Sequence, residues 1–190
     1  MPFDISLYNE EFFEWHLRYA REYSIKTMDW YIDTYKPKSV ADFGCGIGSY
    51  LESAFNKGLR IQGYEISSTA RKYTPETIQP FIKYVDCTTP LSTAVYDCVI
   101  SFETAEHISP RGTWQFVDNI MKACGGILLF TAAPPGQQGT GHINLRSKEY
   151  WLKKFSSLKY EPDLTDSVRL NWKQLGAPEY ICNNLITFTP

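Results

Sequence analysis

The stretch from Glu103 to His107 carries two carboxylates and an imidazole within five residues. If the chain is helical there, Glu103, Glu106 and His107 share one face, because residues three and four apart lie side by side on a helix. His142, further along the chain, offers a second imidazole. Carboxylate oxygens with few nitrogen ligands suit Mg²⁺ or Mn²⁺. These four residues are therefore the candidate metal ligands.

The same residues can also act without a metal. An imidazole with the ordinary pKa of about 6.5 can take a proton from a hydroxyl group. This makes His107 or His142, together with Glu106, a candidate catalytic group. A third interpretation is structural, in which the carboxylates and imidazoles only orient a loop.

A glycine-rich turn offers a second place for chemistry. Glycine occupies every second position from Gly44 to Gly48, so the backbone can approach a ligand closely. A dinucleotide-binding turn needs G-x-G-x-x-G/A, but the two possible registers place Ser49 or Leu51 at the last position. Asp42, just before the turn, repels a pyrophosphate and suits a ligand with a cationic end. S-adenosylmethionine has such an end.

The elements that position these residues follow from an alternation of short apolar runs with helical segments, which is typical of βαβ units around a mostly parallel sheet. The expected strands are Ser39–Phe43, Arg60–Tyr64, Phe81–Val85, Tyr96–Phe102, Gly126–Ala132, Tyr160–Leu164 and Leu185–Thr189. The expected helices are Ser49–Asn56, Ser68–Tyr73, Thr113–Cys124, Lys148–Phe155 and Ser167–Leu175. The fold class is therefore α/β, a doubly wound Rossmann-like fold with seven strands and helices on both faces. Ligands of such sheets bind at the carboxyl ends of the strands.

The first part of the chain differs from this pattern. Apolar and aromatic residues recur at helical spacing from Glu11 to Tyr35, which predicts one or two helices. We expect one domain over residues 1–190, with a helical lid over 1–38 and the catalytic core over 39–190. The lid aromatics that could form a wall of the ligand pocket are Trp15, His16, Tyr19 and Tyr23.

The run from Asp42 to Gly48 resembles the first motif, D-x-G-x-G-x-G, of class I S-adenosylmethionine-dependent methyltransferases, and the resemblance extends over roughly residues 39–132. It implies that Glu65, at the end of the second expected strand, binds the ribose of the cofactor, and that Asp86 binds the adenine amino group. Asp86 could instead only form the turn before Pro90. The implied cofactor-binding residues are Asp42, Gly44, Cys45, Gly46, Gly48, Glu65, Ile66, Asp86, Cys87 and Phe102.

The pattern E-x-x-E-H with a later histidine resembles two metal-assisted branches of this family, the terminal 2′-O-methyltransferases of small RNAs and the ubiquinone-pathway O-methyltransferases. This resemblance implies Mg²⁺ or Mn²⁺ held by Glu103, Glu106, His107 and His142, which would lower the pKa of an acceptor hydroxyl. It favours oxygen as the acceptor atom. The region around His142 departs from both branches, so a metal-free reaction stays open.

The composition narrows the possible partners. The chain has 190 residues, a net charge of −2 and 43% hydrophobic residues, without an apolar run long enough to span a membrane. Its five cysteines form no CxxC pair and the N-terminus lacks a signal-peptide layout, which predicts a cytoplasmic protein. The balanced charge favours a small-molecule acceptor over nucleic acid. We expect a monomer or homodimer. The alternatives are an RNA-directed 2′-O-methyltransferase and a non-catalytic cofactor-binding domain.

Overall fold

A seven-stranded sheet forms the centre of the computed structural model, which describes residues 4–190. The strand order is β3-β2-β1-β4-β5-β7-β6. The strands are β1 (Ser39–Phe43), β2 (Arg60–Glu65), β3 (Ile82–Tyr84), β4 (Tyr96–Ser101), β5 (Cys124–Phe130), β6 (Lys159–Tyr160) and β7 (Ile186–Thr189). β7 is antiparallel to both β5 and β6, and the other neighbouring pairs are parallel. The predicted doubly wound α/β fold is confirmed.

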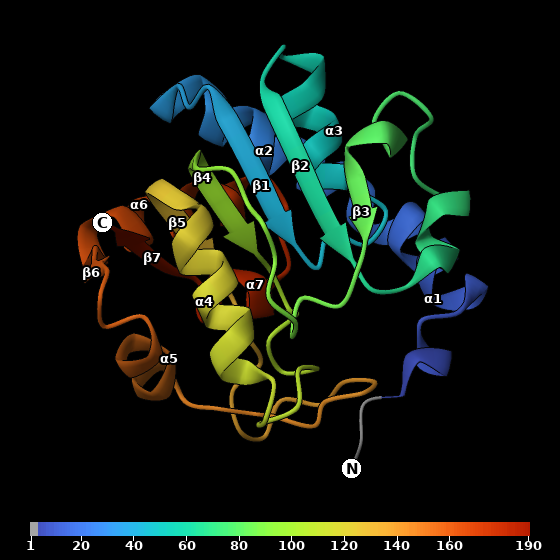
Figure 1. The fold of residues 1–190 in the computed structure, drawn as a ribbon. Helices are drawn as coiled ribbons and strands as arrows, with labels where there is room; N and C mark the ends of the chain where they lie inside the picture. The colour runs from blue at the N-terminus through green and yellow to red at the C-terminus, as the bar shows by residue number, and fades with distance from the viewer. Residues whose placement is uncertain (1–3) are drawn as a thin grey trace.

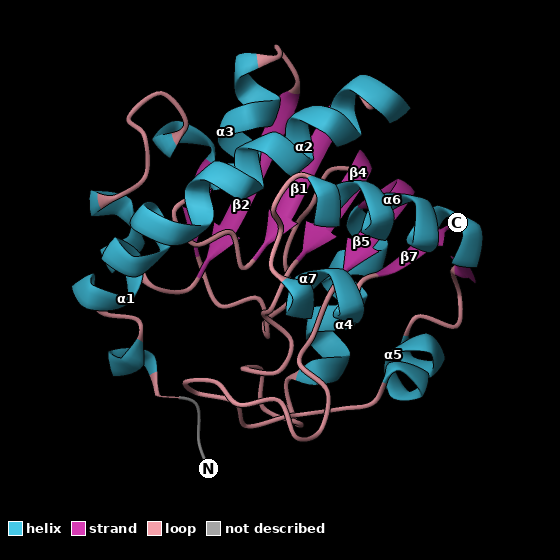
Figure 2. Ribbon diagram, turned by 180° about the vertical axis from the view of Figure 1, so that it is seen from behind, coloured by secondary structure: helices cyan, strands magenta, loops and turns pink. Residues whose placement is uncertain are grey.

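Helices cover both faces of this sheet. The α-helices are α1 (Glu10–Trp15), α2 (Arg21–Tyr35), α3 (Ser49–Asn56), α4 (Thr113–Ala123), α5 (Lys148–Lys154), α6 (Pro162–Gln174) and α7 (Glu179–Asn184), and the short 3₁₀ turns are Ile5–Leu7, Ser68–Lys72 and Gln79–Phe81. Figure 1 shows α4 in front of the sheet, and Figure 2 shows α2, α3 and α6 across the opposite face. In Figure 1 the arrows of β1, β2 and β4 point to one edge, where the long loops gather.

The central strands are buried on both faces, as their nearly continuous apolar sequence predicts. All five residues of β1 are buried. Because successive side chains of a strand point to opposite faces, Val40 packs in the core beneath α2, α3 and α6, whereas Ala41 and Phe43 pack in the core beneath α4 and α5. The two cores together fix the direction of β1, and hence the position of the glycine turn that follows it.

Several boundaries differ from the sequence expectation. The expected strand Tyr160–Leu164 ends at Tyr160, because Pro162 starts α6 at the first turn, where proline is favoured. The expected helix Ser68–Tyr73 is a 3₁₀ turn. The six-residue helix α7 was not predicted. It precedes β7 and places Tyr180 near the sheet edge where the loops gather.

The N-terminal helices are joined by a five-residue π-helix, His16–Ala20, between α1 and α2. Such wide turns are rare and occur often at functional sites. α2 packs along α3, and α1 lies over the 3₁₀ turn Ser68–Lys72, where Lys72 forms an ion pair with Glu10 at 2.7 Å. Within residues 4–190, no helix has the length and apolar character needed to span a membrane.

Candidate functional site

A cavity of about 330 Å³ opens at the carboxyl ends of β1, β2 and β4, beneath the lid helix α1. Nine of the ten residues predicted to bind the cofactor line it: Asp42, Gly44, Cys45, Gly46, Glu65, Ile66, Asp86, Cys87 and Phe102. Further wall residues come from the lid and from the segment after β4. The sheet edge therefore brings together residues that lie more than sixty positions apart in the sequence, as the rule for doubly wound sheets predicts.

The glycine turn has a backbone that other residues adopt with difficulty. Gly44 has a φ of +86° and Gly48 a φ of +79°, both in the left-handed region. A Cβ atom on Gly44 would lie 2.2 Å from the Oγ1 atom of Thr104, and one on Gly48 would lie 2.7 Å from Cδ1 of Ile78. Gly48 does not line the cavity but forms the cap before α3. Thr104 and Ile78 therefore leave no room for a side chain at Gly44 or Gly48.

Glu65 connects β2 to this turn. Its Oε2 atom accepts the backbone N–H of Gly46 at 2.9 Å, and its Oε1 atom accepts that of Ser67 at 2.8 Å. Burial raises the pKa of the Glu65 carboxyl, and these backbone hydrogen bonds oppose the rise. Each carboxylate oxygen retains a second lone pair for a ribose hydroxyl. Glu65 can therefore shape the turn and bind a ligand at once.

Asp42 is only 2% exposed, although it lines the cavity. Burial, together with the negative charge of Glu65, raises the pKa of Asp42 well above its usual range. A buried carboxylate beside another one is costly unless a cation or hydrogen-bond donor compensates it. The site therefore favours a ligand that brings a positive charge to Asp42.

Asp86 is exposed and follows β3. Its Oδ1 atom accepts both the backbone N–H and the hydroxyl of Thr88, each at 2.7 Å. This is the turn-forming role that the sequence left open. The residue also lines the cavity, and its Oδ2 atom has no hydrogen-bond partner among the bonds of the described residues, so it can accept a donor from a ligand. The two roles are compatible.

The helix that would have aligned Glu103, Glu106 and His107 does not form. Glu103 has a φ of +47°, and the residues after it form a turn in which the backbone N–H of His107 donates to Thr104 at 3.0 Å. A left-handed residue breaks the helical repeat, so the three side chains do not share a helix face. Glu103 instead accepts hydrogen bonds from the amides of Gln137 and Asn184, at 3.0 and 3.2 Å.

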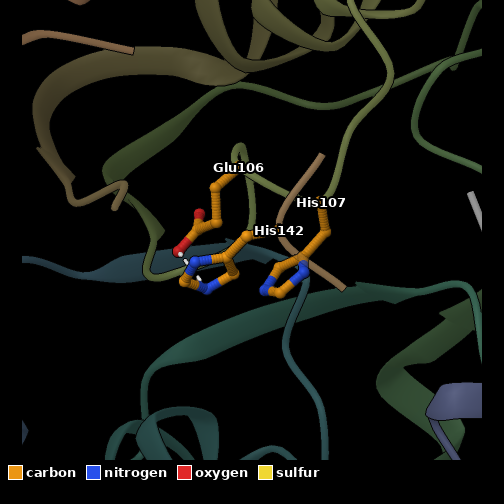
Figure 3. Close-up of side chains that lie close together, drawn as sticks. All are labelled: Glu106, His107 and His142. Carbon is orange, nitrogen blue, oxygen red and sulfur yellow. Dashed lines mark ion pairs between the residues drawn. The ribbon is translucent and has the colours of Figure 1, made fainter. Parts of the chain in front are cut away.

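Three of the four candidate metal ligands still come together. Glu106, His107 and His142 each place a ligand atom within 4.8 Å of the others, and Figure 3 shows the three side chains converging. Backbone hydrogen bonds tie their two loops, since Ile143 and Asn144 donate to the Glu106 carbonyl at 3.0 and 2.9 Å. Glu103 lies outside this group of three. Of the three, only His107 lines the cavity.

The two imidazoles are held in one tautomer. Nδ1 of His107 lies 3.1 Å from the carbonyl of Gly141, and Nδ1 of His142 lies 3.2 Å from that of Gln137. A carbonyl oxygen only accepts, so each Nδ1 carries the proton and each Nε2 presents a lone pair. Burial, and next the adjacent His142, lower the pKa of His107 to about 4. His107 is therefore neutral at pH 7.

The carboxyl of Glu106 is fully buried. Its Oε1 atom accepts the backbone N–H of Ala133 at 3.2 Å and lies 4.0 Å from Nε2 of His142. Its Oε2 atom has no hydrogen-bond partner among the described residues. Burial raises the pKa of Glu106 well above its usual range, and the charge of Glu103 adds to the rise.

The lid meets the sequence expectation only in part. His16 and Tyr23 line the cavity, but Trp15 is 48% exposed and Tyr19 57% exposed, so they do not form its wall. The wall residues that the sequence did not predict include Tyr8 and Tyr180. No pattern in the sequence pointed to Tyr180, because its helix was not predicted.

Comparison with known proteins places the fold. Residues 41–130 match a family model described as a methyltransferase domain, just under half of the chain. Among curated proteins, no sequence matches.

Solved structures match over more of the chain. A SAM-dependent methyltransferase from Archaeoglobus fulgidus has a TM-score of 0.64 at 17% identity, covering 94% of this chain and 98% of that one. The sugar N-methyltransferase KedS8 from Streptoalloteichus sp. has a TM-score of 0.67 at 12% identity, covering 94% and 91%. TehB from Haemophilus influenzae has a TM-score of 0.59 at 15% identity. That match covers 70% of this chain and 50% of TehB. The matched structures include O-methyltransferases and N-methyltransferases, some with bound S-adenosylhomocysteine. At these identities they establish the fold and leave the acceptor open.

Proposed function

We propose that this S-adenosylmethionine-dependent methyltransferase transfers the methyl group of its cofactor to a hydroxyl oxygen of a small-molecule acceptor. The observation that carries the proposal is the single cavity wall that combines the glycine turn with Asp42, Glu65 and Asp86. Their carboxylates suit, in turn, a cationic amino-acid end, a ribose and an adenine amino group. The cavity volume of about 330 Å³ is within the range of small-molecule binding sites.

The residues around this cavity contribute mainly by positioning. When bound, S-adenosylmethionine supplies a methyl group activated by its sulfonium, and transfer needs the acceptor oxygen in line with it. The lid residues Phe12, Phe13 and His16 cover the cavity and exclude water. Without a bound cation, His107 offers its Nε2 lone pair to an acceptor hydroxyl. Because its pKa is about 4, it orients that hydroxyl and is only a weak base.

A divalent cation fits the group formed by Glu106, His107 and His142, and we propose these residues as its ligands. The Nε2 lone pairs of His107 and His142 are free to bind a cation. Their Nδ1 protons are hydrogen-bonded to backbone carbonyls, which is common for metal-ligating histidines. The Oε2 atom of Glu106 is buried and has no hydrogen-bond partner among the described residues. Two imidazoles with one carboxylate favour Mn²⁺ or a later transition metal over Mg²⁺. When bound, the cation would supply Lewis acidity beside His107.

Binding of S-adenosylmethionine and S-adenosylhomocysteine tests the central proposal. At about 100 times Kd, either compound should stabilise the fold by about 2.7 kcal/mol, which raises the unfolding temperature of a domain of this size by about 5–11 °C. Differential scanning fluorimetry measures the shift, and NAD is the control because the turn lacks the dinucleotide pattern. Unchanged unfolding temperatures with both compounds would overturn the proposal.

The metal proposal has a separate test. After EDTA treatment, Mn²⁺ should raise the unfolding temperature of the wild type by several degrees, and Mg²⁺ by less. Glu106→Gln should lose the Mn²⁺ effect, because the amide cannot replace a carboxylate ligand. Glu149→Gln is the matched control, since Glu149 is an exposed residue in the first turn of α5. An equal response of Glu106→Gln and wild type to Mn²⁺ would leave the group with a structural role.

The residues that line the cavity indicate the class of acceptor, and the cysteines indicate the location. The residues that line the cavity include no Lys or Arg, which supports a small molecule over an RNA phosphate backbone. We propose a cytoplasmic location, because the five cysteines are all free and buried and such thiols persist in reducing compartments.

A further inference from the structure

The cavity has an unbalanced charge. Four carboxylates line it, those of Asp42, Glu65, Asp86 and Glu103. None of them forms an ion pair among the described residues. The nitrogen bases on the wall are the imidazoles of His16 and His107, and no Lys or Arg lines the cavity among the described residues. The wall therefore presents carboxyl groups without a cationic side chain to balance them, and it suits ligands with positive charge.

The cofactor accounts for three of these carboxylates. Under the proposed function, on which this inference rests, Asp42, Glu65 and Asp86 face its amino-acid end, its ribose and its adenine. Glu103 has no such role. It follows β4, on the opposite side of β1 from β2, and it lies outside the group of three possible metal ligands.

The carboxylate of Glu103 is held in a fixed position. Gln137 and Asn184 donate to its two oxygens, and Asn184 also donates to the side-chain oxygen of Gln137 at 2.9 Å. Its backbone N–H donates to the hydroxyl of Thr131 at 2.9 Å. The two amides are neutral, so they orient the carboxylate without compensating its charge. Each of its oxygens keeps capacity for another donor.

Three tyrosine rings line the same cavity as Glu103. Tyr23 comes from α2, Tyr50 from α3 and Tyr180 from α7. Tyr50 packs against Phe102, the residue before Glu103, with ring centroids 4.9 Å apart. The negative charge of Glu103 also contributes to the raised pKa of each of these tyrosines. A carboxylate and aromatic rings in one cavity commonly bind an ammonium group together.

We propose that the acceptor is a hydroxylated amine, such as an amino alcohol or an amino sugar, whose protonated amino group binds Glu103 among Tyr23, Tyr50 and Tyr180. The same wall disfavours acceptors that carry phosphate or carboxylate, because like charges repel in a partly buried site. Glu103 is thus a specificity-determining residue, and the amino group anchors the acceptor while a hydroxyl receives the methyl group.

A matched set of small fragments tests this inference on the full chain saturated with S-adenosylhomocysteine. The set contains equal numbers of hydroxylated amines, neutral polyols and hydroxylated acids, and ligand-observed NMR detects binding. Amines should outnumber the other two classes among the binders several-fold. Glu103→Gln should weaken the best amine by about 10- to 100-fold, the effect of losing one charged hydrogen-bond partner. Glu103→Asp, which keeps the charge, should retain the preference, and the exposed Glu76→Gln should match the wild type.

The outcomes separate this inference from the proposed function. Failure of S-adenosylhomocysteine to bind contradicts the proposed function before any fragment is added. If it binds, a set of binders without an excess of amines overturns the inference, and so does an amine preference that survives in Glu103→Gln. If Glu103→Gln does not fold, the counts with the wild type decide alone.

Discussion

Gly44→Ala should destabilise the protein by about 2–5 kcal/mol and prevent measurable cofactor binding. A left-handed backbone costs an L-residue about 1–2 kcal/mol, and forcing an extra methyl into a packed site costs about 1–3 kcal/mol more. The new Cβ would lie 2.2 Å from Oγ1 of Thr104, so the turn or the segment after β4 must move. Both segments line the cavity. Thermal unfolding gives the stability loss, and calorimetric titration with S-adenosylhomocysteine gives the affinity.

Gly46 provides the matched control. It also has a positive φ, +53°, but a Cβ there would meet no atom within 4 Å. Gly46→Ala should therefore cost only about 1 kcal/mol of stability. A Gly44→Ala protein as stable as Gly46→Ala would show that Thr104 does not fix the turn. Combining Gly44→Ala with Thr104→Ala should restore part of the stability.

Glu65→Ala should weaken cofactor binding by about 10- to 100-fold. A hydrogen bond to a charged group contributes about 1.5–3 kcal/mol, which corresponds to that range of affinity. The variant also leaves the backbone N–H groups of Gly46 and Ser67 without their acceptors, so the turn itself becomes less fixed. Calorimetric titration with S-adenosylhomocysteine measures the loss. Glu65→Gln, which keeps one acceptor oxygen, should fall between the variant and the wild type.

A modified ligand separates the two roles of Glu65. The wild type should bind S-adenosylhomocysteine more tightly than its 2′-deoxy analogue, because the carboxylate accepts from the ribose. Glu65→Ala should bind the two compounds equally, although both more weakly. If the variant still discriminates between them, the carboxylate acts only on the turn and a different group recognises the ribose.

Local patterns in the sequence predicted the central part of the fold well. The apolar run before the glycine turn is buried as β1, and the acidic residue after the next apolar run lies beside the turn, at 2.9 Å from the N–H of Gly46. These outcomes depend on strand order and burial, which hydrophobic patterning determines. For the same reason Asp42, Glu65 and Asp86 line one cavity, although they lie far apart in the sequence.

The segment after β4 shows where such patterns fail. The spacing of Glu103, Glu106 and His107 fits a helix, yet the φ of +47° at Glu103 depends on contacts made by Thr131, Gln137 and Asn184, which come from distant parts of the chain. Local propensity cannot anticipate a conformation that tertiary contacts hold. The group of Glu106, His107 and His142 formed nevertheless, because the loops after β4 and β5 end at the same edge of the sheet.

The π-helix between α1 and α2 lets the lid contain one residue more than a regular helix would. The backbone N–H of Arg21 donates to the carbonyl of His16, five residues back, whereas an α-helix pairs residues four apart. Because the wide turn takes up the additional residue, the helices on either side of it keep nearly the phase of one regular helix. The loss of one residue from His16–Ala20 should therefore restore regular pairing with little rotation, so that Phe12 and Phe13 stay on the cavity wall. In evolutionary terms, this segment can lose a residue without displacing the lid, and the change in the wall would be confined to the surroundings of His16.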